Sequence, residues 1–414
     1  MTRADTIVIG GGAAGMMAAG TAAGEGRVVL LIEPNAKLGR KLRITGKGRC
    51  NVTNDCDVRT FMANVPHNPK FLYSAVNAFP PADAMHFFEE LGVPLKTERG
   101  GRVFPVSDNA NDVADRLEAW LRGRGVRVVR NRAEAIEYDA GGAVCGVRTD
   151  RGVIPCRAAV VCTGGASYPG TGSTGDGYAL AAAAGHRVID PAPSLVPLES
   201  PDAFCAELAG LAPRNVTLTV LENGKAIHKE QGEMLFAHFG VTGPLVLSAS
   251  AHMRSFGEWA YALAIDFKPA LDAEKLDARI LRDFDKFKNR DVGNALDELM
   301  PRSLIPVVLR LAAIPPDTKT HSVTRVQRRA LAGTLKAFPV RVTGPRPIAE
   351  AIVTRGGVDV KQVDPRSMAS RLVPGLYFAG EVLDVDAYTG GFNLQIAWAT
   401  GRLAGLHAGT EASE

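Results

Sequence analysis

The chain has 414 residues, of which 46% are hydrophobic and 22% are charged, and its formal net charge is +4. This composition is typical of a folded globular protein and excludes a disordered or fibrous one. The length predicts two domains, and a small charge spread along the chain gives no argument for a nucleic-acid-binding protein.

The N-terminal residues lack the apolar core and the small-residue cleavage site of a signal peptide. No window approaches the roughly eighteen uninterrupted apolar residues that a membrane-spanning helix needs. The six cysteines lack the CxxC spacing of zinc sites, so we expect reduced thiols and no metal. The sequence therefore predicts a soluble, cytoplasmic protein without a membrane partner.

The chain opens with alternating strand and helix signals. A short apolar run at residues 6–10 precedes an Ala/Met-rich helical stretch at 13–23, and a second apolar run covers 28–33. A strand, a helix and a strand within about thirty residues form a βαβ unit, whose two strands must be parallel. This predicts an α/β fold with a Rossmann-like nucleotide-binding domain.

A GxGxxG motif lies between the first strand and the first helix. Gly10 allows a tight turn, Gly12 lets backbone amides approach a pyrophosphate, and Gly15 permits close helix packing. Glu33, at the end of the second strand, can accept hydrogen bonds from ribose hydroxyls. The alternative is a glycine-rich turn without a ligand, but the strand–turn–helix context favours a dinucleotide.

The later segments indicate a discontinuous arrangement. Short apolar runs from 127 to 162 predict a meander that returns to the sheet, and prolines after Asp190 mark a linker. Asn223-Gly224 predicts a hairpin turn. Residues from about 270 to 336 favour helices, and glycine-bounded strands return at 344–357 and 375–380. We therefore predict one domain from residues 1–190 and 345–414, with residues 191–344 inserted into it.

Six ordered motifs carry a resemblance to a known family. They are GGGAAG at 10–15, ITGKGRCNVTN at 44–54, GRVFPVSDNA at 101–110, CTGGASYPGTGSTGDGYALA at 162–181, GEMLFAHFGVTGP at 232–244 and GLYFAGEVLDVDAYTGGFNLQIAWATG at 375–401. Over nearly its whole length the chain resembles the aminoacetone oxidase-like flavoproteins, which include reductases of oxidised bile acids. The resemblance implies a noncovalent FAD in a two-part domain. It also implies an inserted domain with a barrel-like part, 191–268 and 337–344, and a helical part.

The FAD site is expected to draw on segments far apart in the chain. Basic residues at 40–49 are better phosphate partners than a nucleic-acid patch, and the helix after Gly391 would direct its first amides at the pyrimidine side of the flavin. Lys47 and Ala387 depart from the family, which has glycine at both positions. The predicted cofactor-binding residues are Gly10, Gly12, Ala13, Ala14, Gly15, Glu33, Arg40, Lys41, Thr45, Gly46, Gly48, Arg49, Cys50, Asn51, Ala133, Thr163, Gly164, Gly380, Glu381, Gly391, Phe392, Asn393 and Leu394.

Three other features have competing interpretations. A second GxGxxG at 170–175 is separated from its strand, so a structural turn is favoured over a second nucleotide site. Cys50 and Cys56 have one residue too many between them for the dithiol of flavin disulfide reductases, so a packed Cys50 is favoured. His238 is a candidate proton donor, although a lone histidine between two phenylalanines is more often a packed residue.

These observations predict an FAD-dependent oxidoreductase that transfers hydride between the flavin and a small organic substrate or NAD(P)H. One alternative is an NAD(P)H-dependent reductase of activated C=C bonds, on steroid or bile-acid-like substrates, instead of an amine oxidase. Another is an RNA-binding or sensor flavoprotein, although nucleic acid is a less favoured partner. The sequence gives no indication of oligomeric state.

Overall fold

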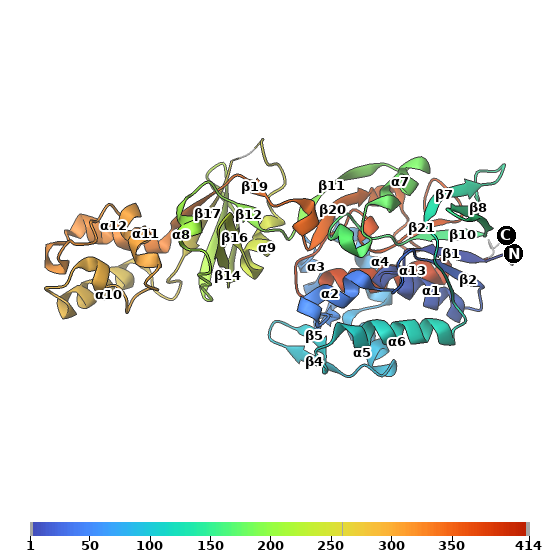
Figure 1. The fold of residues 1–414 in the computed structure, drawn as a ribbon, viewed down its shortest axis with the longest axis horizontal. Coiled ribbons are helices and arrows are strands. Elements are labelled where there is room, and N and C mark those ends of the chain that lie inside the picture. Colours follow the sequence, from blue (N-terminus) through green and yellow to red (C-terminus); the bar gives the residue numbers. More distant parts are fainter. Residues whose placement is uncertain (1–2, 259, 411–414) are drawn as a thin grey trace. The chain divides into compact units, whose positions relative to one another are not determined.

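The computed structural model describes residues 3–258 and 260–410, in which two compact units are distinguished (Figure 1). Unit 1 comprises Met1–Ser194 and Ile348–Glu414, and unit 2 comprises Leu195–Pro347. Each unit buries its own cluster of hydrophobic residues. No described helix combines the length and the apolar character that crossing a membrane requires.

A five-stranded parallel sheet forms the centre of unit 1. The strand order is β21-β10-β1-β2-β6, and every neighbouring pair is parallel. All residues of β1, β2 and β10 are buried, as expected where helices cover both faces of a parallel sheet. The predicted βαβ unit and fold class are confirmed. The strands are β1 Thr6–Ile9, β2 Val29–Ile32, β6 Arg127–Val129, β10 Ala158–Val161 and β21 Leu376–Phe378.

Two helices from opposite ends of the chain, α1 and α13, pack along each other in unit 1 (Figure 1). Glycines on α13 permit the close approach: a Cβ added at Gly401 would lie 2.4 Å from the Ala14 carbonyl oxygen, and one at Gly405 would lie 2.5 Å from that of Ala18. The N-terminal and C-terminal segments therefore form one structure. The helices of unit 1 are α1 Ala13–Gly24, α2 Arg40–Gly48, α3 Val58–Ala63, η1 Pro69–Leu72, α4 Tyr73–Ala78, α5 Pro81–Glu90, α6 Ala110–Gly123, η2 Pro169–Thr171, α7 Asp176–Ala183, η5 Ile348–Glu350, η6 Val360–Gln362, η7 Gly380–Val382 and α13 Phe392–His407.

Three small antiparallel sheets complete unit 1. Strands β7, β8 and β9 form the predicted meander, after which the chain returns to the main sheet as β10. The sheet β3-β5-β4 and the pair β11-β20 flank the segments described below as the candidate site. The strands are β3 Thr53–Asn54, β4 Leu95–Glu98, β5 Arg102–Pro105, β7 Ala133–Tyr138, β8 Val144–Thr149, β9 Gly152–Pro155, β11 Val188–Ser194 and β20 Val353–Val358.

Unit 2 contains two four-stranded antiparallel sheets and a group of helices. The described strands form separate sheets and no closed barrel, so the barrel-like expectation is met only by two small sheets. Asn223 and Gly224 both have positive φ and join β13 to β14, as the hairpin signal predicts. The elements are β12 Leu198–Glu199, α8 Phe204–Glu207, β13 Val216–Glu222, β14 Lys225–Gly232, β15 Leu235–Ala237, β16 Gly240–Thr242, α9 Pro244–Ser250, β17 Tyr261–Asp266, α10 Ala273–Lys286, η3 Val292–Asn294, α11 Leu304–Leu311, η4 Thr320–Ser322, α12 Arg325–Lys336, β18 Phe338–Val342 and β19 Gly344–Pro345.

The close packing of α1 on α13 can be tested with one methyl group. Gly401→Ala should lower the free energy of unfolding of unit 1 by about 1–3 kcal/mol, because the methyl would push the helices apart. In the control Gly333→Ala on α12, the added Cβ meets nothing within 4 Å, so helix propensity should stabilise unit 2 by up to about 1 kcal/mol. Urea unfolding followed by circular dichroism measures both. An unchanged midpoint for Gly401→Ala would contradict the close contact.

Candidate active site

The turn between β1 and α1 has the geometry of a pyrophosphate cradle. Gly10 has φ +103°, and a Cβ added there would lie 2.5 Å from the Cys162 carbonyl oxygen. A Cβ added at Gly15 would lie 1.8 Å from the Gly10 carbonyl oxygen, so these two glycines are required by packing. At Gly12 a Cβ would meet nothing within 4 Å. This leaves open space at the helix N-terminus, where unpaired amides and the helix dipole favour an anion.

Glu33 is fixed at the end of β2 beside this turn. Its side chain is 9% exposed, and Oε2 accepts a hydrogen bond from the Gly11 amide at 2.8 Å. Oε1 accepts from the Asn35 amide at 2.9 Å and from Asn35 Nδ2 at 2.6 Å, and Arg40 Nη1 donates to Asn35 Oδ1 at 2.6 Å. A carboxylate has about four acceptor sites, so Glu33 is held in place and keeps capacity for a ribose hydroxyl.

An ion pair joins the basic segment to the C-terminal segment. Lys41 Nζ lies 2.8 Å from Glu381 Oε2 and donates to Ser167 Oγ at 2.6 Å. Glu381 Oε1 also accepts from Ser167 Oγ at 3.1 Å and from the Thr354 amide at 2.8 Å. Gly380 brings this group to the cradle, because a Cβ added there would lie 2.7 Å from Ala14 Cβ.

Ser167 and Thr354 are missing from the predicted residues. Ser167 lies within the quoted motif at 162–181, so the sequence did contain a signal for it. Thr354 lies on β20, far from the Ser167 loop in the sequence, so no local pattern indicates their contact. Its Oγ1 accepts from the Ala166 amide at 2.8 Å and from the Ser167 amide at 3.1 Å.

The segment at 45–50 has an unusual backbone. Gly46, Lys47, Gly48 and Cys50 all have positive φ, between +58° and +83°. The non-helical backbone at Gly46 and Lys47 interrupts α2. The left-handed region favours glycine, the residue that the resemblance implies at position 47. Lys47 itself is exposed to solvent. Thr45 holds the segment, because its Oγ1 donates to the Leu42 carbonyl at 2.7 Å and its carbonyl accepts from the Cys50 amide at 3.0 Å.

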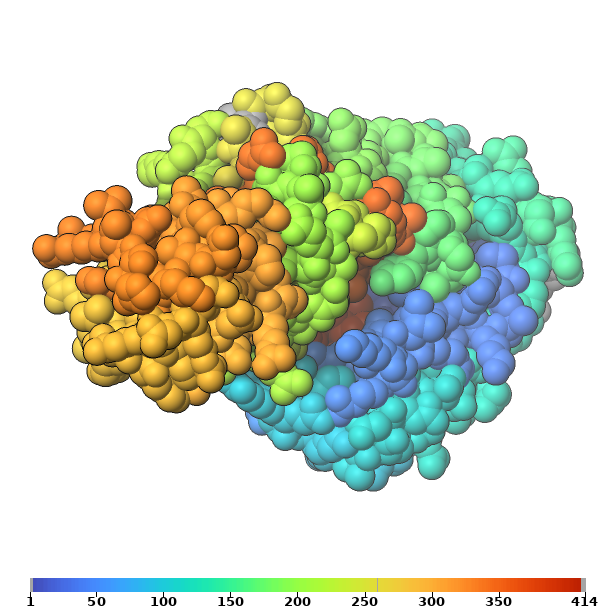
Figure 2. Space-filling model, turned by 60° about the vertical axis from the view of Figure 1, so that its left-hand side comes forward, coloured from blue at the N-terminus to red at the C-terminus, as the bar shows by residue number. Residues whose placement is uncertain are grey.

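Two of the basic residues expected to bind phosphate are paired with carboxylates. Arg49 binds Glu98 and Asp108, with its Nε 2.7 Å from Asp108 Oδ1, and its guanidinium covers the Phe104 ring. Likewise, Arg43 Nη1 lies 2.7 Å from Asp115 Oδ1 on α6. Figure 2 shows the surface of the N-terminal region, in blue, next to the cyan surface of the segments that follow it, in agreement with the contact of α2 with α6. Because Lys41 is likewise paired, with Glu381, charge neutralisation among the described residues leaves Arg40, which donates to the neutral Asn35 side chain, as the better phosphate partner.

The N-terminus of α13 is fixed against the segment at 51–54. Gly391 has φ +101°, and a Cβ added there would lie 2.2 Å from the Thr53 carbonyl oxygen. Asn393 Oδ1 accepts from the Ala387 amide at 3.0 Å, and its Nδ2 donates to the Ala387 carbonyl at 2.8 Å. Phe392 packs on Phe61 with ring centroids 5.6 Å apart. The first amides of α13, from Phe392 to Leu394, are thus held rigidly.

The remaining predicted residues lie at three places in unit 1. Thr163 lies two residues after the end of β10, and its buried Oγ1 has no hydrogen-bond partner among the described residues. Gly164 next to it has φ +76°. Asn51 Oδ1 accepts from the Val103 amide at 3.1 Å, and Ala133 begins β7. The orphaned hydroxyl and the open space at Gly12 both fit a bound dinucleotide.

The cysteines and the second glycine motif give no sign of additional redox or nucleotide sites. Burial raises the pKa of Cys50 to about 12 and that of Cys56 to about 11, so neither is a thiolate near neutral pH. Gly172 and Gly175 belong to a loop of more than a dozen residues between β10 and α7, without a tight strand-to-helix turn. Among the described residues, no group of His, Cys, Asp and Glu side chains could hold a metal ion.

His238 lies in unit 2, on the turn between β15 and β16. Its side chain is exposed, and its ring lies 5.1 Å from that of Phe239. It is therefore not the packed residue of the alternative interpretation, and its role as a proton donor stays a prediction.

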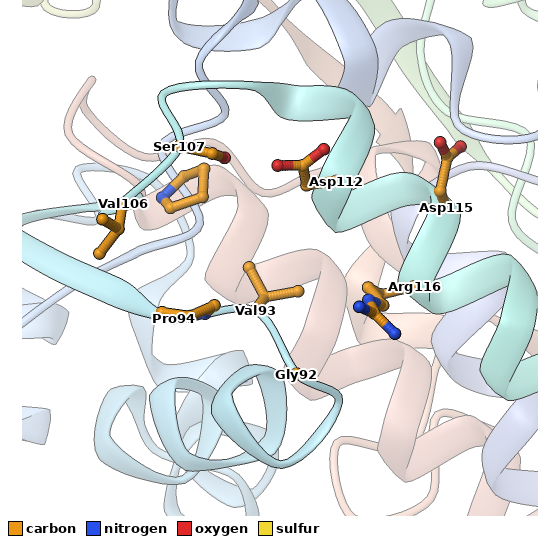
Figure 3. A pocket seen from close by; sticks show the side chains of 9 residues that line it. Gly92, Val93, Pro94, Val106, Ser107, Asp112, Asp115 and Arg116 are labelled. Carbon is orange, nitrogen blue, oxygen red and sulfur yellow. The ribbon is translucent and has the colours of Figure 1, made fainter.

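A cavity of about 500 Å³ in unit 1 lies apart from the predicted residues (Figure 3). Asp112, Asp115 and Arg116 line it from α6, and Pro94 and Val106 come from the segments around β4 and β5. Asp115 is already paired with Arg43. The cavity contains none of the residues expected to bind FAD.

Comparisons with known proteins place this chain in a family. The family model described as HI0933-like protein Rossmann domain matches residues 4–407. The chain is 32% identical to a 3-dehydro-bile acid delta(4,6)-reductase of Clostridium scindens, over 97% of this chain and 98% of that protein. It is also 32% identical to a ribosomal RNA dihydrouridine synthase of Escherichia coli, over 97% and 96% of the two chains.

A solved structure supports the fold. The 3-ketosteroid delta1-dehydrogenase of Sterolibacterium denitrificans matches with a TM-score of 0.53 and 14% identity, over 98% of this chain and 99% of that one. The chain is an FAD-dependent oxidoreductase and belongs to the HI0933-like Rossmann family.

Proposed function

We propose that this protein is a reductase that uses FAD and NAD(P)H to saturate a C=C bond conjugated to a carbonyl group. The observation that carries the proposal is that two kinds of relative with different substrates have names describing this one reaction. A delta(4,6)-reductase acts on double bonds conjugated to a 3-keto group, and a dihydrouridine synthase adds two hydrogens to the uracil ring. Both match nearly the whole chain.

The overall reaction balances with one reductant. NAD(P)H gives up a hydride and becomes NAD(P)⁺, the substrate gains that hydride on one carbon, and a proton adds to the other. Bound FAD would supply the two-electron relay between them. The His238 imidazole is the candidate donor of the proton, as the sequence suggests.

Different residues of unit 1 would bind different parts of FAD. The α1 amides after Gly12 would bind the pyrophosphate, Glu33 would accept from the ribose, and Lys41 would exchange part of its pairing with Glu381 for a phosphate. The amides at the start of α13 would stabilise negative charge on the pyrimidine side of the reduced flavin.

The proposed function is tested by anaerobic spectroscopy of the FAD-loaded protein. NADPH or NADH should bleach the flavin absorption, and a conjugated substrate should restore it without oxygen. The two arms use a 4,6-dien-3-one steroid and a uridine-containing ribosomal RNA, each analysed by mass spectrometry for a gain of two hydrogens. Flavin that stays oxidised with both nucleotides, or peroxide formed stoichiometrically from a primary amine, would overturn the proposal.

The cradle at Gly12 can be tested without disturbing the fold. Gly12→Asp adds a side chain to open space at a helix N-cap, where aspartate is a favourable residue, so the unfolding midpoint should stay the same or rise. The added carboxylate would occupy the proposed pyrophosphate position, and FAD affinity should fall by at least about 100-fold, as for two charge-assisted hydrogen bonds. The uncharged Gly12→Asn separates bulk from repulsion. Full FAD occupancy in Gly12→Asp would place the pyrophosphate elsewhere.

Turnover of a Cys56 variant distinguishes the proposed mechanism from one that uses a Cys50–Cys56 dithiol. Cys56→Ser should leave NAD(P)H-driven turnover within about twofold of the parent protein, because a cysteine with a pKa of about 11 is a poor nucleophile at neutral pH. In the parent protein, iodoacetamide labelling of Cys56 should accelerate about tenfold per pH unit up to that pKa. Loss of turnover in the variant, or a Cys50–Cys56 disulfide found by peptide mapping, would restore the dithiol hypothesis.

A further inference from the structure

A second pocket in unit 1, of about 510 Å³, is open to solvent and strongly basic. It lies between the segment at 68–71 and the segment at 360–371. Three of its lining residues are cations and none is acidic. The lining residues are Asn68, Lys70, Phe71, Val360, Lys361, Val363, Pro365 and Arg371.

The cations of this pocket are not engaged in ion pairs with described residues. Within residues 3–258 and 260–410, none of Lys70, Lys361 and Arg371 forms an ion pair. The nearby Asp359 does not line the pocket, and its Oδ1 accepts from the Lys361 amide at 3.0 Å. Cations that form no ion pair attract an anionic ligand.

The rest of the lining suits a ring next to the anion. Phe71 and Val360 are each 8% exposed and Val363 is 1% exposed, so the pocket has a firm apolar wall. Arg371 is held at the rim, because its amide donates to the Gln362 carbonyl at 2.9 Å. A ligand that combines a phosphate with a planar ring is typically a nucleotide. The volume of the pocket suits the half of a dinucleotide that carries one base.

One lining residue of the pocket is hydrogen-bonded to the segment that follows η7. Asn68 Nδ2 donates to the Asp384 carbonyl at 2.7 Å, and Asp384 follows η7, which contains Gly380 and Glu381. His67 Nε2 also lies 3.0 Å from Asp384 Oδ2. A nucleotide held here would therefore lie on the same unit as the flavin that it reduces.

We propose that this pocket binds the adenosine half of NADPH through its 2′-phosphate. The inference rests on the proposed function, which requires a nicotinamide reductant. Basic side chains select the 2′-phosphate of NADPH, whereas an acidic residue would select the free 2′-hydroxyl of NADH. The lining contains lysines and an arginine and no acid.

Binding of 2′,5′-ADP to the FAD-loaded protein tests the site without turnover. Isothermal titration should give an affinity that Lys361→Gln lowers about tenfold and Lys70→Gln/Lys361→Gln about 100-fold, as expected for lost charge-assisted contacts. Binding of 5′-AMP, which lacks the 2′-phosphate, should change much less. Arg366→Gln is the matched control, because Arg366 is exposed in the same segment but does not line the pocket. An unchanged affinity in the double variant overturns the proposal, and so does inorganic phosphate that binds as tightly as 2′,5′-ADP.

Steady-state kinetics separates the reductant from a macromolecular substrate. The double variant should raise the KM for NADPH at least tenfold and leave kcat and the KM for NADH unchanged. A raised KM for RNA with an unchanged KM for NADPH would assign the pocket to the RNA backbone and overturn the proposal. If neither nucleotide reduces the flavin, the proposed function fails, and the 2′,5′-ADP titration still decides whether the pocket is a nucleotide site.

Discussion

The contact between α1 and α13 is the constraint on which the candidate site depends. Gly401 and Gly405 let the backbone of α13 approach the carbonyls of Ala14 and Ala18, so two helices separated by most of the chain share one interface. Protein interiors are close-packed, so this interface fixes the N-terminus of α13 relative to that of α1 within narrow limits. Two positive helix ends, one suited to a pyrophosphate and one to a flavin ring, are thereby held at a set separation.

Electrostatics in the site follows from this scaffold. Lys41 and Glu381 are each about one-fifth exposed and are brought together by α2 and η7. Such a partly buried pair is weak evidence for stability, since desolvation offsets much of the attraction. Its value is geometric: Ser167 and the Thr354 amide also bind Glu381, so Lys41 is held beside the α1 cradle instead of extending into solvent. Arg43 and Arg49, neutralised by acids of neighbouring elements, instead stabilise the basic segment itself.

Local patterns predicted the local parts of this structure. The βαβ unit, the turn at Gly10–Gly15 and the hairpin at Asn223-Gly224 follow from residues adjacent in the chain, and the structure has all three. Contacts between distant segments were not predictable in the same way. The sequence around Arg49 is the same whether this residue binds a phosphate or Glu98. Helix α13 is buried on nearly every side, so its hydrophobic pattern does not show which face meets α1. The resemblance implies a barrel-like part, and the described strands of unit 2 form two small sheets; pairings such as β12 with β19 and β17 with β18 join segments far apart in the chain, which no local pattern shows.

The two departures from the family pattern differ in what they require of the fold. At position 47 the backbone is left-handed, with φ +61°, and a residue other than glycine costs about 1–2 kcal/mol there. That cost is local, because the Lys47 side chain extends into solvent and displaces no packed neighbour. Ala387 is fully buried, and its amide and carbonyl are both bound by the Asn393 side chain. The methyl group of Ala387 is therefore compatible with the bonds from Asn393 that hold the start of α13. The loop at 47 can therefore vary in charge without disturbing packed neighbours, whereas the turn at 387 is constrained by the helix end that it supports.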